Sequence, residues 1–221
     1  MPATGAAARP PVLVDEDSWF EWVQVHTREL LIAAMVLVVA AAVVILYRSA
    51  SATQAAQAEQ ALVGPEQAIQ AGNIPLAQSD LRKLITRYSG TAAAAEAGMM
   101  LAATYYQQQK YADGVASLEH VVTTGAAEPF ASAIERLRAD GYVQQGKYRE
   151  AATHFVAAAG KTRYPTEQAR LRAAAARAYA AAGDTMAALA IWRQLATDTK
   201  SGEASEAQLL IGELTARPVK P

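Results

Sequence analysis

A chain of 221 residues has room for one folded domain of ordinary size together with extensions. Its hydrophobic content of 52% includes much alanine, which favours helix and allows close helix–helix approach, so the composition predicts an all-α fold. The net charge of −1 lacks the basic excess of a nucleic-acid-binding protein, and the absence of cysteine excludes disulfides and thiolate chemistry within this sequence.

Two segments of different character precede the first long apolar run. Residues 1–14 are rich in alanine and proline, and we predict a disordered cytoplasmic tail. Residues 15–29 begin with acidic residues and a serine that suit a helix N-terminus, and Trp19 and Trp22 follow on one helical face. We interpret this segment as an amphipathic juxtamembrane helix, with a partner-binding helix as the alternative.

The uncharged run of eighteen residues from 30 to 47 predicts a transmembrane helix. At about 1.5 Å per residue it would span about 27 Å, close to the hydrocarbon thickness of a bilayer. The alternative is a cleaved signal peptide, because Ala50-Ser51-Ala52 resembles a cleavage site. A signal core is usually only ~7–15 residues and the preceding region here is long and acidic, so we expect an uncleaved anchor. Arg9 and Arg28 against Arg48 give a slight bias towards a cytoplasmic N-terminus.

Beyond the membrane segment, the sequence predicts a helical repeat domain over residues 49–216 and a tail at 217–221. A helix from 49 to 71 is expected to kink or break at Gly64-Pro65. Further helices are predicted at 74–87, 91–108, 112–123, 130–145, 148–159, 166–182, 185–198 and 203–216. We expect the last helix to cap the array, because a terminal repeat must cover its apolar face.

A pattern that recurs every 37 residues pairs these helices. A tyrosine near the end of the first helix is followed by a small residue and then a large apolar residue in the second: Tyr105, Tyr142, Tyr179; Gly114, Ala151, Ala188; Leu118, Phe155, Trp192. An earlier copy places other residues in the same register: Ala68, Ala77, Leu81. We assign structural roles to this set, because small residues permit close helix approach and large ones fill the gap to the next pair. Glycine at 72, 146 and 183 is expected to supply the left-handed backbone of the turn.

This order of small, tyrosine, alanine and aromatic positions resembles the tetratricopeptide repeat, whose unit is ~34 residues. The extra residues of each copy are expected in loops between repeats, near 125–127 and 160–162. The resemblance implies a helical-hairpin solenoid of about four repeats, and solenoids of this kind mostly bind other proteins.

The whole arrangement also resembles a specific family. An aromatic stretch, Trp19-Phe20-Glu21-Trp22, precedes one membrane helix, an alanine- and glutamine-rich helix follows, and degenerate repeats such as Tyr88-Ser89-Gly90-Thr91 come next. This is similar, over nearly the full length, to the YfgM-like proteins, ancillary subunits of the bacterial SecYEG translocon. The resemblance implies an inner-membrane anchor with a cytoplasmic N-terminus, a periplasmic repeat domain, and association with the translocon and periplasmic chaperones. Residues 87–91 also resemble assembly lipoproteins of the BamD type, but those carry a lipobox cysteine.

The sequence contains no pattern that indicates catalysis. His26, His120 and His154 lack a metal-ligand spacing, and no nucleophile or nucleotide-binding motif is present. We therefore expect no enzymatic activity, no metal, no cofactor, and neither a nucleic acid nor a small molecule as substrate.

The first helices of tetratricopeptide arrays line the concave surface, so the resemblance implies a binding groove there. By register, the groove-facing candidates are Glu96, Met99, Ala103, Tyr106, Gln107, Arg136, Asp140, Val143, Gln144, Arg170, Ala173, Arg177 and Ala180. The three arginines are candidates to capture partner carboxylates, whereas Met99 and Tyr106 are candidates to accept apolar side chains. The alternative is that these are ordinary solvated or intra-array residues.

These observations predict a membrane-anchored adaptor that binds secreted proteins or chaperones near the translocon. Its expected partners are proteins and the lipid bilayer. The alternative is an envelope scaffold that coordinates cell division or outer-membrane assembly through the repeat domain.

Overall fold

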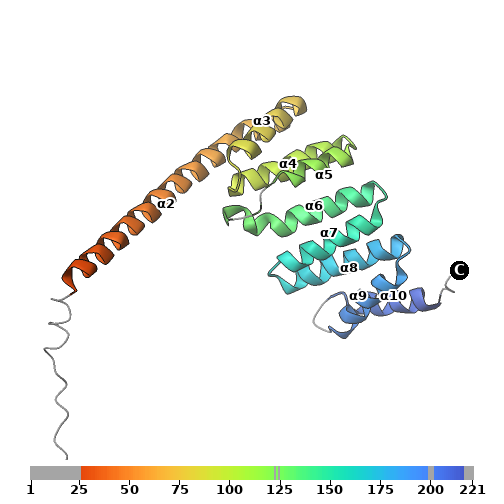
Figure 1. The fold of residues 1–221 in the computed structure, drawn as a ribbon. Helices are drawn as coiled ribbons and strands as arrows, with labels where there is room; N and C mark the ends of the chain where they lie inside the picture. The colour runs from red at the N-terminus through yellow and green to blue at the C-terminus, as the bar shows by residue number, and fades with distance from the viewer. Residues whose placement is uncertain (1–25, 122, 124, 199–201, 217–221) are drawn as a thin grey trace, which may run out of the picture. The chain divides into compact units, whose positions relative to one another are not determined.

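The computed structural model describes residues 26–121, 123, 125–198 and 202–216. Every regular element in this part of the chain is helical: the α-helices α2 to α10 and one 3₁₀-helix, η1 (Figure 1). The chain divides into two compact units, with the boundary between Ser51 and Ala52. The prediction of an all-α fold is confirmed for the described residues.

Helix α2 runs from Thr27 to Gln70, and its N-terminal part forms the described portion of the first unit. None of its most apolar stretch is buried; Leu37, for example, is 71% exposed. Apolar side chains all round a helix suit lipid, where the helix satisfies its own backbone hydrogen bonds. By length and composition α2 is able to cross a membrane.

The predicted segments before this helix fall largely outside the described residues. This is the case for the tail at 1–14 and for most of the amphipathic helix at 15–29. Residues 27–29 belong to α2 itself. The predicted tail at 217–221 also lies outside the described residues.

The second unit begins with the C-terminal part of α2, which continues through Gly64-Pro65 without a break. Ala58, Leu62, Pro65 and Ala68 form its buried face at intervals of three or four residues. This spacing places them on one side of the helix, where they pack as the first helix of the first hairpin. The sequence predicted that this helix would either kink or break at Gly64-Pro65. The continuous helix excludes the break.

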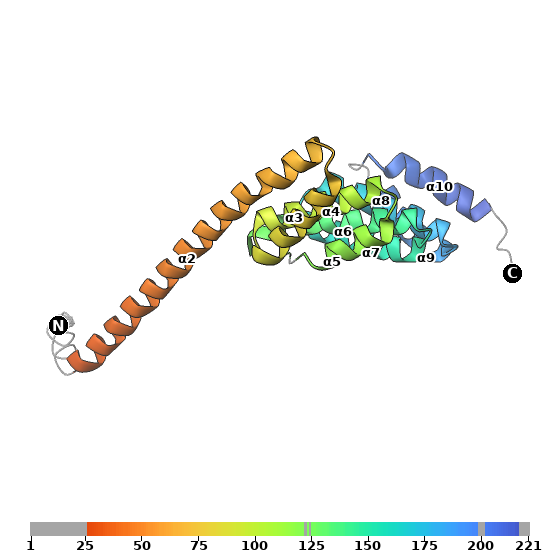
Figure 2. The same ribbon diagram turned by 90° about the horizontal axis from the view of Figure 1, so that it is seen from above.

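The remaining elements of the second unit follow as stacked hairpins (Figures 1 and 2). They are α3 (Ile74–Arg87), α4 (Ala92–Gln107), α5 (Tyr111–Glu119), η1 (Gly125–Phe130), α6 (Ala131–Gln144), α7 (Tyr148–Lys161), α8 (Pro165–Ala181), α9 (Thr185–Thr197) and α10 (Ala204–Ala216). From α3 onward, each α-helix packs against the next one in the chain. Figure 2 shows the first helices α4, α6 and α8 along one face and the second helices α5, α7 and α9 along the other.

The four hairpin turns share one hydrogen-bonded geometry. An amide N–H donates to the carbonyl five residues earlier, at 2.8 to 2.9 Å, in each of four pairs: Asn73 to Ala68, Lys110 to Tyr105, Lys147 to Tyr142, and Asp184 to Tyr179. The preceding residue has positive φ in every turn: Gly72, Gln109, Gly146, Gly183. This is the Schellman motif, which ends a helix and reverses the chain, so the predicted role of the three glycines is confirmed.

The repeated small and large residues are buried as the pattern predicted. Six have no exposed surface, Ala77, Ala151, Ala188, Leu81, Leu118 and Trp192, while Phe155 is 7% exposed. At Gly114 a Cβ would collide with the ring of Tyr106, so the second hairpin requires glycine at the small position. Tyr105, Tyr142 and Tyr179 are half-buried beside the turns.

The expected positions of the inter-repeat loops are only partly correct. Residues 125–127 do lie between repeats, where they open the 3₁₀-helix η1. Gly160 and Lys161 instead belong to α7, which is longer than α5. The extra residues of that repeat therefore lengthen helices, which extends the buried face with Ala158 and Ala159.

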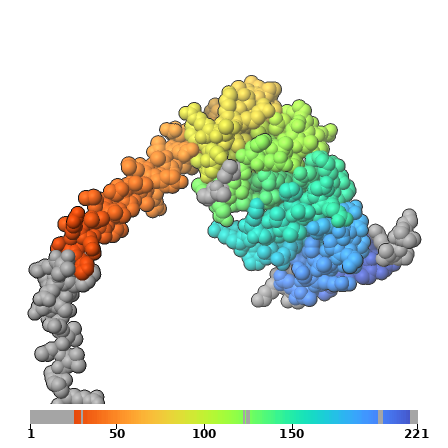
Figure 3. Space-filling model, in the orientation of Figure 1, coloured from red at the N-terminus to blue at the C-terminus, as the bar shows by residue number. Residues whose placement is uncertain are grey.

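Helix α10 closes the C-terminal end of the stack. It packs against α9, and its Ala207, Leu210 and Leu214 join the core around Trp192. The space-filling view shows the hairpins in contact along this unit, from yellow at α3 to dark blue at α10 (Figure 3). The predicted four-repeat solenoid with a capping helix is confirmed.

Candidate protein-binding surface

A cavity of about 700 Å³ lies in the C-terminal half of the array. Its lining comes from α6, α7, α8, the first turn of α10 and the residue before α10: Arg136, Asp140, Phe155, Glu167, Arg170, Leu171, Ala174, Arg177, Glu203 and Glu206. The first helices α6 and α8 supply most of these residues, as expected for the binding face of a tetratricopeptide array.

Helical spacing explains why these side chains converge. Arg136 and Asp140 are one turn apart on α6. On α8, Glu167, Arg170 and Arg177 recur at intervals of three or seven residues, which places them along one face. The cavity therefore follows directly from the register of two neighbouring first helices.

Each arginine of the cavity pairs with a carboxylate of the chain itself. Arg136 lies 3.2 Å from Asp140, and Arg170 lies 3.5 Å from Glu167. Both pairs are substantially exposed, so solvent screening leaves them little net stabilisation. The three arginines, which the sequence made candidates to capture partner carboxylates, are thus already paired with carboxylates of the chain.

Arg177 makes the strongest of these contacts. Its Nε and Nη2 each donate to one carboxylate oxygen of Glu206 at 2.8 Å, and Glu203 lies 3.8 Å away. A two-pronged guanidinium–carboxylate contact of this kind is stronger and more directional than a single hydrogen bond. The hydrogen bond from Arg177 lowers the pKa of Glu206. This contact joins α10 to α8.

Asp140 is in the opposite electrostatic situation. Its partial burial raises the pKa of its carboxyl group, and the positive charge of Arg136 offsets only part of this effect. Its negative charge is therefore less well compensated than that of Glu206.

The structure brings only some of the predicted site residues together. Arg136, Asp140, Arg170 and Arg177 line one cavity. Three further candidates are exposed on the first helices but do not line it: Glu96, Gln107, Gln144. Met99 is half-buried and packs against the N-terminal core. Ala173 is fully buried, so its predicted position on the groove is wrong.

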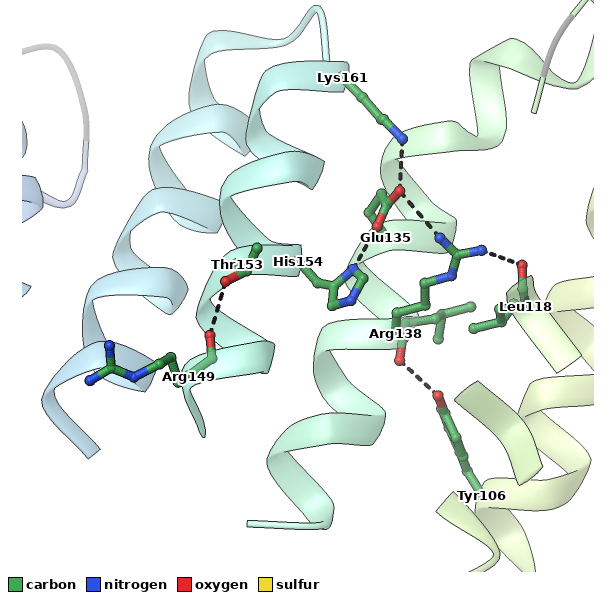
Figure 4. Close-up of polar contacts among 9 residues, drawn as sticks. Tyr106, Leu118, Glu135, Arg138, Arg149, Thr153, His154 and Lys161 are labelled. Atoms are coloured by element: carbon green, nitrogen blue, oxygen red, sulfur yellow. Dashed lines mark hydrogen bonds and ion pairs between the residues drawn. The ribbon is translucent and has the colours of Figure 1, made fainter. Parts of the chain in front are cut away.

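Tyr106 is engaged in packing between hairpins. Its hydroxyl donates a hydrogen bond of 2.8 Å to the carbonyl of Leu137, as Figure 4 shows. Its ring occupies the space that a Cβ at Gly114 or Gly141 would need, and burial raises the pKa of its hydroxyl. These contacts give Tyr106 the intra-array role that the sequence left as the alternative.

A second polar cluster, centred on Glu135, was not anticipated from the sequence. Glu135 is 8% exposed, and its carboxylate lies 2.8 Å from Nδ1 of His154 and accepts a hydrogen bond of 2.7 Å from Lys161 (Figure 4). Arg138 also contacts it at 3.4 Å and donates to the carbonyl of Leu118. Burial acts to raise the pKa of Glu135, but the hydrogen bonds from Lys161 and His154 bring it below its usual value. The cluster ties α6 to α7 and α5.

The fold is that of a tetratricopeptide-like solenoid, a class of arrays that mediate protein–protein interactions and are typically non-catalytic. A family model described as the tetratricopeptide repeat-like domain matches residues 20–152. The chain belongs to this family.

The comparison with solved structures agrees on the fold. The structure of nearly identical tetratricopeptide-like repeats of a putative kinesin light chain from Podospora anserina has a TM-score of 0.51. It is 17% identical and the alignment covers 72% of this chain and 85% of that one. At this identity the likeness concerns the fold alone. No curated protein matches the chain.

Proposed function

We propose that this chain is a membrane-anchored adaptor that binds proteins through the face of its first helices. The cavity between α6, α8 and α10 carries this proposal, because it gathers charged and apolar side chains around one concave space. The family supports a protein-binding role, since solenoids of this type present extended interaction surfaces. The apolar stretch of α2 supplies the anchor.

We place the anchor in the bacterial inner membrane, with the N-terminus in the cytoplasm and the array in the periplasm. The resemblance to the YfgM-like proteins supports this orientation, and Arg9 and Arg28 on the N-terminal side against Arg48 on the other favour it slightly. A reporter that is active only outside the cytoplasm, fused after Pro221, tests the orientation. Activity is the expected result, whereas an expressed but silent fusion would contradict it.

The partners that we propose are translocon subunits, periplasmic chaperones or secreted chains. The same resemblance supports this choice, and tethering beside the translocon would raise the local concentration of the array near such partners. Weak contacts at one cavity would then suffice for productive association.

The test is affinity purification of the full-length chain from chemically crosslinked membranes. Ala174 lines the cavity, so Ala174→Trp should fill it and reduce recovery of translocon and chaperone components. Ala190→Trp is the matched control, because Ala190 is an exposed alanine on the second helix α9 and does not line the cavity. Unfolding midpoints establish that both variants fold.

Equal recovery by Ala174→Trp and the unchanged chain would reject the cavity as the binding site. If the unchanged chain recovered neither the translocon nor a chaperone, the adaptor function would be rejected. Recovery of division or outer-membrane assembly proteins in their place would favour an envelope scaffold.

A further inference from the structure

The charge balance of the cavity carries an inference about the partner, and this inference rests on the proposed function. Three guanidinium groups line the cavity, against four carboxylates: Asp140, Glu167, Glu203 and Glu206. The carboxylates come from α6, from α8, and from α10 with the turn before it, so the excess of negative charge belongs to the cavity as a whole.

A partner carboxylate would meet arginines that are already paired. Arg136, Arg170 and Arg177 lie 3.2, 3.5 and 2.8 Å from carboxylates of the chain. Binding an additional carboxylate would require displacement of one of these and would increase the negative excess. Arg177 is the least available, because Glu206 occupies two of its nitrogens.

A partner cation would meet a carboxylate that is incompletely compensated. Asp140 has one ion pair, with Arg136, and its side chain is 42% exposed. The raised pKa of Asp140 has burial as its main cause, and Arg136 offsets only part of it. A second positive charge beside Asp140 would therefore stabilise its ionised form.

The cavity also offers an apolar surface to the stem of a long side chain. Ala174 lines it with a partly exposed side chain, and Phe155 and Leu171, although 7% and 3% exposed, also contribute to the lining. Lysine and arginine pack their methylene stems on such surfaces while their charged ends reach polar groups. A glutamate side chain has a shorter stem and ends in a negative charge, which the excess of carboxylates in the cavity would repel.

We propose that the cavity binds a lysine or arginine side chain from an extended segment of the partner. The cationic group pairs with Asp140 and the neighbouring carboxylates, and the methylene stem packs against Phe155 and Leu171. This assignment differs from the capture of partner carboxylates, for which the sequence made the three arginines candidates.

Fluorescence anisotropy with the full-length chain in detergent micelles tests the proposal. The probes are three short dye-labelled peptides of one common leucine- and phenylalanine-containing sequence, differing only in a central lysine, glutamine or glutamate. We expect the lysine peptide to bind about fivefold more tightly than the glutamine peptide, and the glutamate peptide to bind most weakly.

Two substitutions should move the lysine preference in opposite directions. Asp140→Asn should remove most of it, while Arg170→Gln should increase it, because Glu167 then becomes available to the peptide. Asp80→Asn is the matched control, since Asp80 makes an exposed ion pair with Lys83 on α3 and its loss changes the net charge equally. A nonspecific loss of folding would not produce effects of opposite sign.

Tighter binding of the glutamate peptide would overturn the charge assignment and leave the proposed function standing. An equal loss of lysine preference in Asp140→Asn and Asp80→Asn would also overturn it, because net charge alone would then explain the preference. If none of the three peptides bound, both the assignment and the use of the cavity as a binding site would be rejected.

Discussion

The two halves of the repeat array have cores of different composition. The core of the N-terminal hairpins contains large aliphatic side chains: Leu62, Leu81, Leu84, Ile85, Leu101, Leu118, Ile134. The two C-terminal cores consist mainly of alanine, with a few large residues such as Phe155, Leu171, Trp192 and Leu195. One repeat pattern therefore supports two kinds of packing.

The difference has an energetic and a functional consequence. Alanine allows helices to approach closely but buries little apolar area, so each large residue in the C-terminal half carries more of the local stability. Among the described residues, one ion pair, Lys83–Asp80, lies in the N-terminal half, whereas eight others join residues from Glu135 onward. The C-terminal half thus combines a core made mostly of alanine with a surface rich in ion pairs, and the candidate binding cavity lies in this half.

Loss of Trp192 should have the largest effect on stability. Trp192 is fully buried among alanines of α8, α9 and α10, so Trp192→Ala should lower the free energy of unfolding of this half by about 3–5 kcal/mol. Urea unfolding of the full-length chain measures this, with Met186→Ala on the same helix as the control. Met186 is 85% exposed and should change stability by less than about 0.5 kcal/mol. Similar small effects of both substitutions would contradict a core that depends on a few large residues.

Removal of the Glu135 carboxylate should have the next largest effect. Glu135→Gln leaves Lys161 and Arg138 without their buried anionic partner, and should cost about 2–3 kcal/mol at neutral pH. This free-energy cost is smaller than that of breaking a fully buried ion pair, because Lys161 is 41% exposed. Arg170→Gln, which breaks an exposed pair, is the comparison and should cost less than about 1 kcal/mol. An equal cost for the two would show that burial of the cluster is unimportant.

The same carboxylate predicts a pH dependence. The pKa of Glu135 is lower in the folded chain than its ordinary value of 4.5, so its contribution to stability is complete above that value. The contribution disappears as the pH falls through the folded-state pKa, because protonation removes the ion pairs. Thermal unfolding between neutral and acidic pH should therefore show a steeper acid loss in the unchanged chain than in Glu135→Gln. Parallel curves for the two would argue against this linkage.

The turn at Gln109 should give the smallest effect, in the stabilising direction. Gln109 has φ of 60°, whereas the equivalent Gly146 has φ of 72°. Gln109→Gly relieves the left-handed strain and should stabilise the chain by about 0.5–1 kcal/mol. Gly146→Gln is the reciprocal variant and should destabilise it, since a side chain at a φ of 72° is strained even where the surrounding space is open. Effects of the same sign would show that the two turns are not equivalent.

The sequence was sufficient for most of the fold because its regularity is local. The spacing between Tyr142, Gly146 and Ala151 sets the end of one helix, the turn and the contact of the next, so helix bounds follow from it. The last two residues of α7 were missed because Gly160 resembles a loop residue, although it continues the helix.

The candidate site was only partly predictable, because its residues meet through tertiary packing. Register placed Arg136, Arg170 and Arg177 on first helices, but Glu206 belongs to the capping helix α10 and Glu203 to the turn before it, both outside the repeat. The sequence left the role of Tyr106 open between groove and packing, because its hydrogen-bond partner, the carbonyl of Leu137, comes from the next hairpin. Such contacts depend on how hairpins stack, which spacing alone does not specify.

The central claim is that the C-terminal half of the first-helix face is the binding surface. Glu96 and Arg170 occupy equivalent repeat positions on α4 and α8, and both are exposed. The direct measurement places a photo-crosslinking residue at each position in the membrane-bound full-length chain and compares the yield of partner adducts. We predict adducts with translocon or chaperone components at position 170 and few at position 96. A higher yield at position 96 would contradict the claim and assign binding to the N-terminal half.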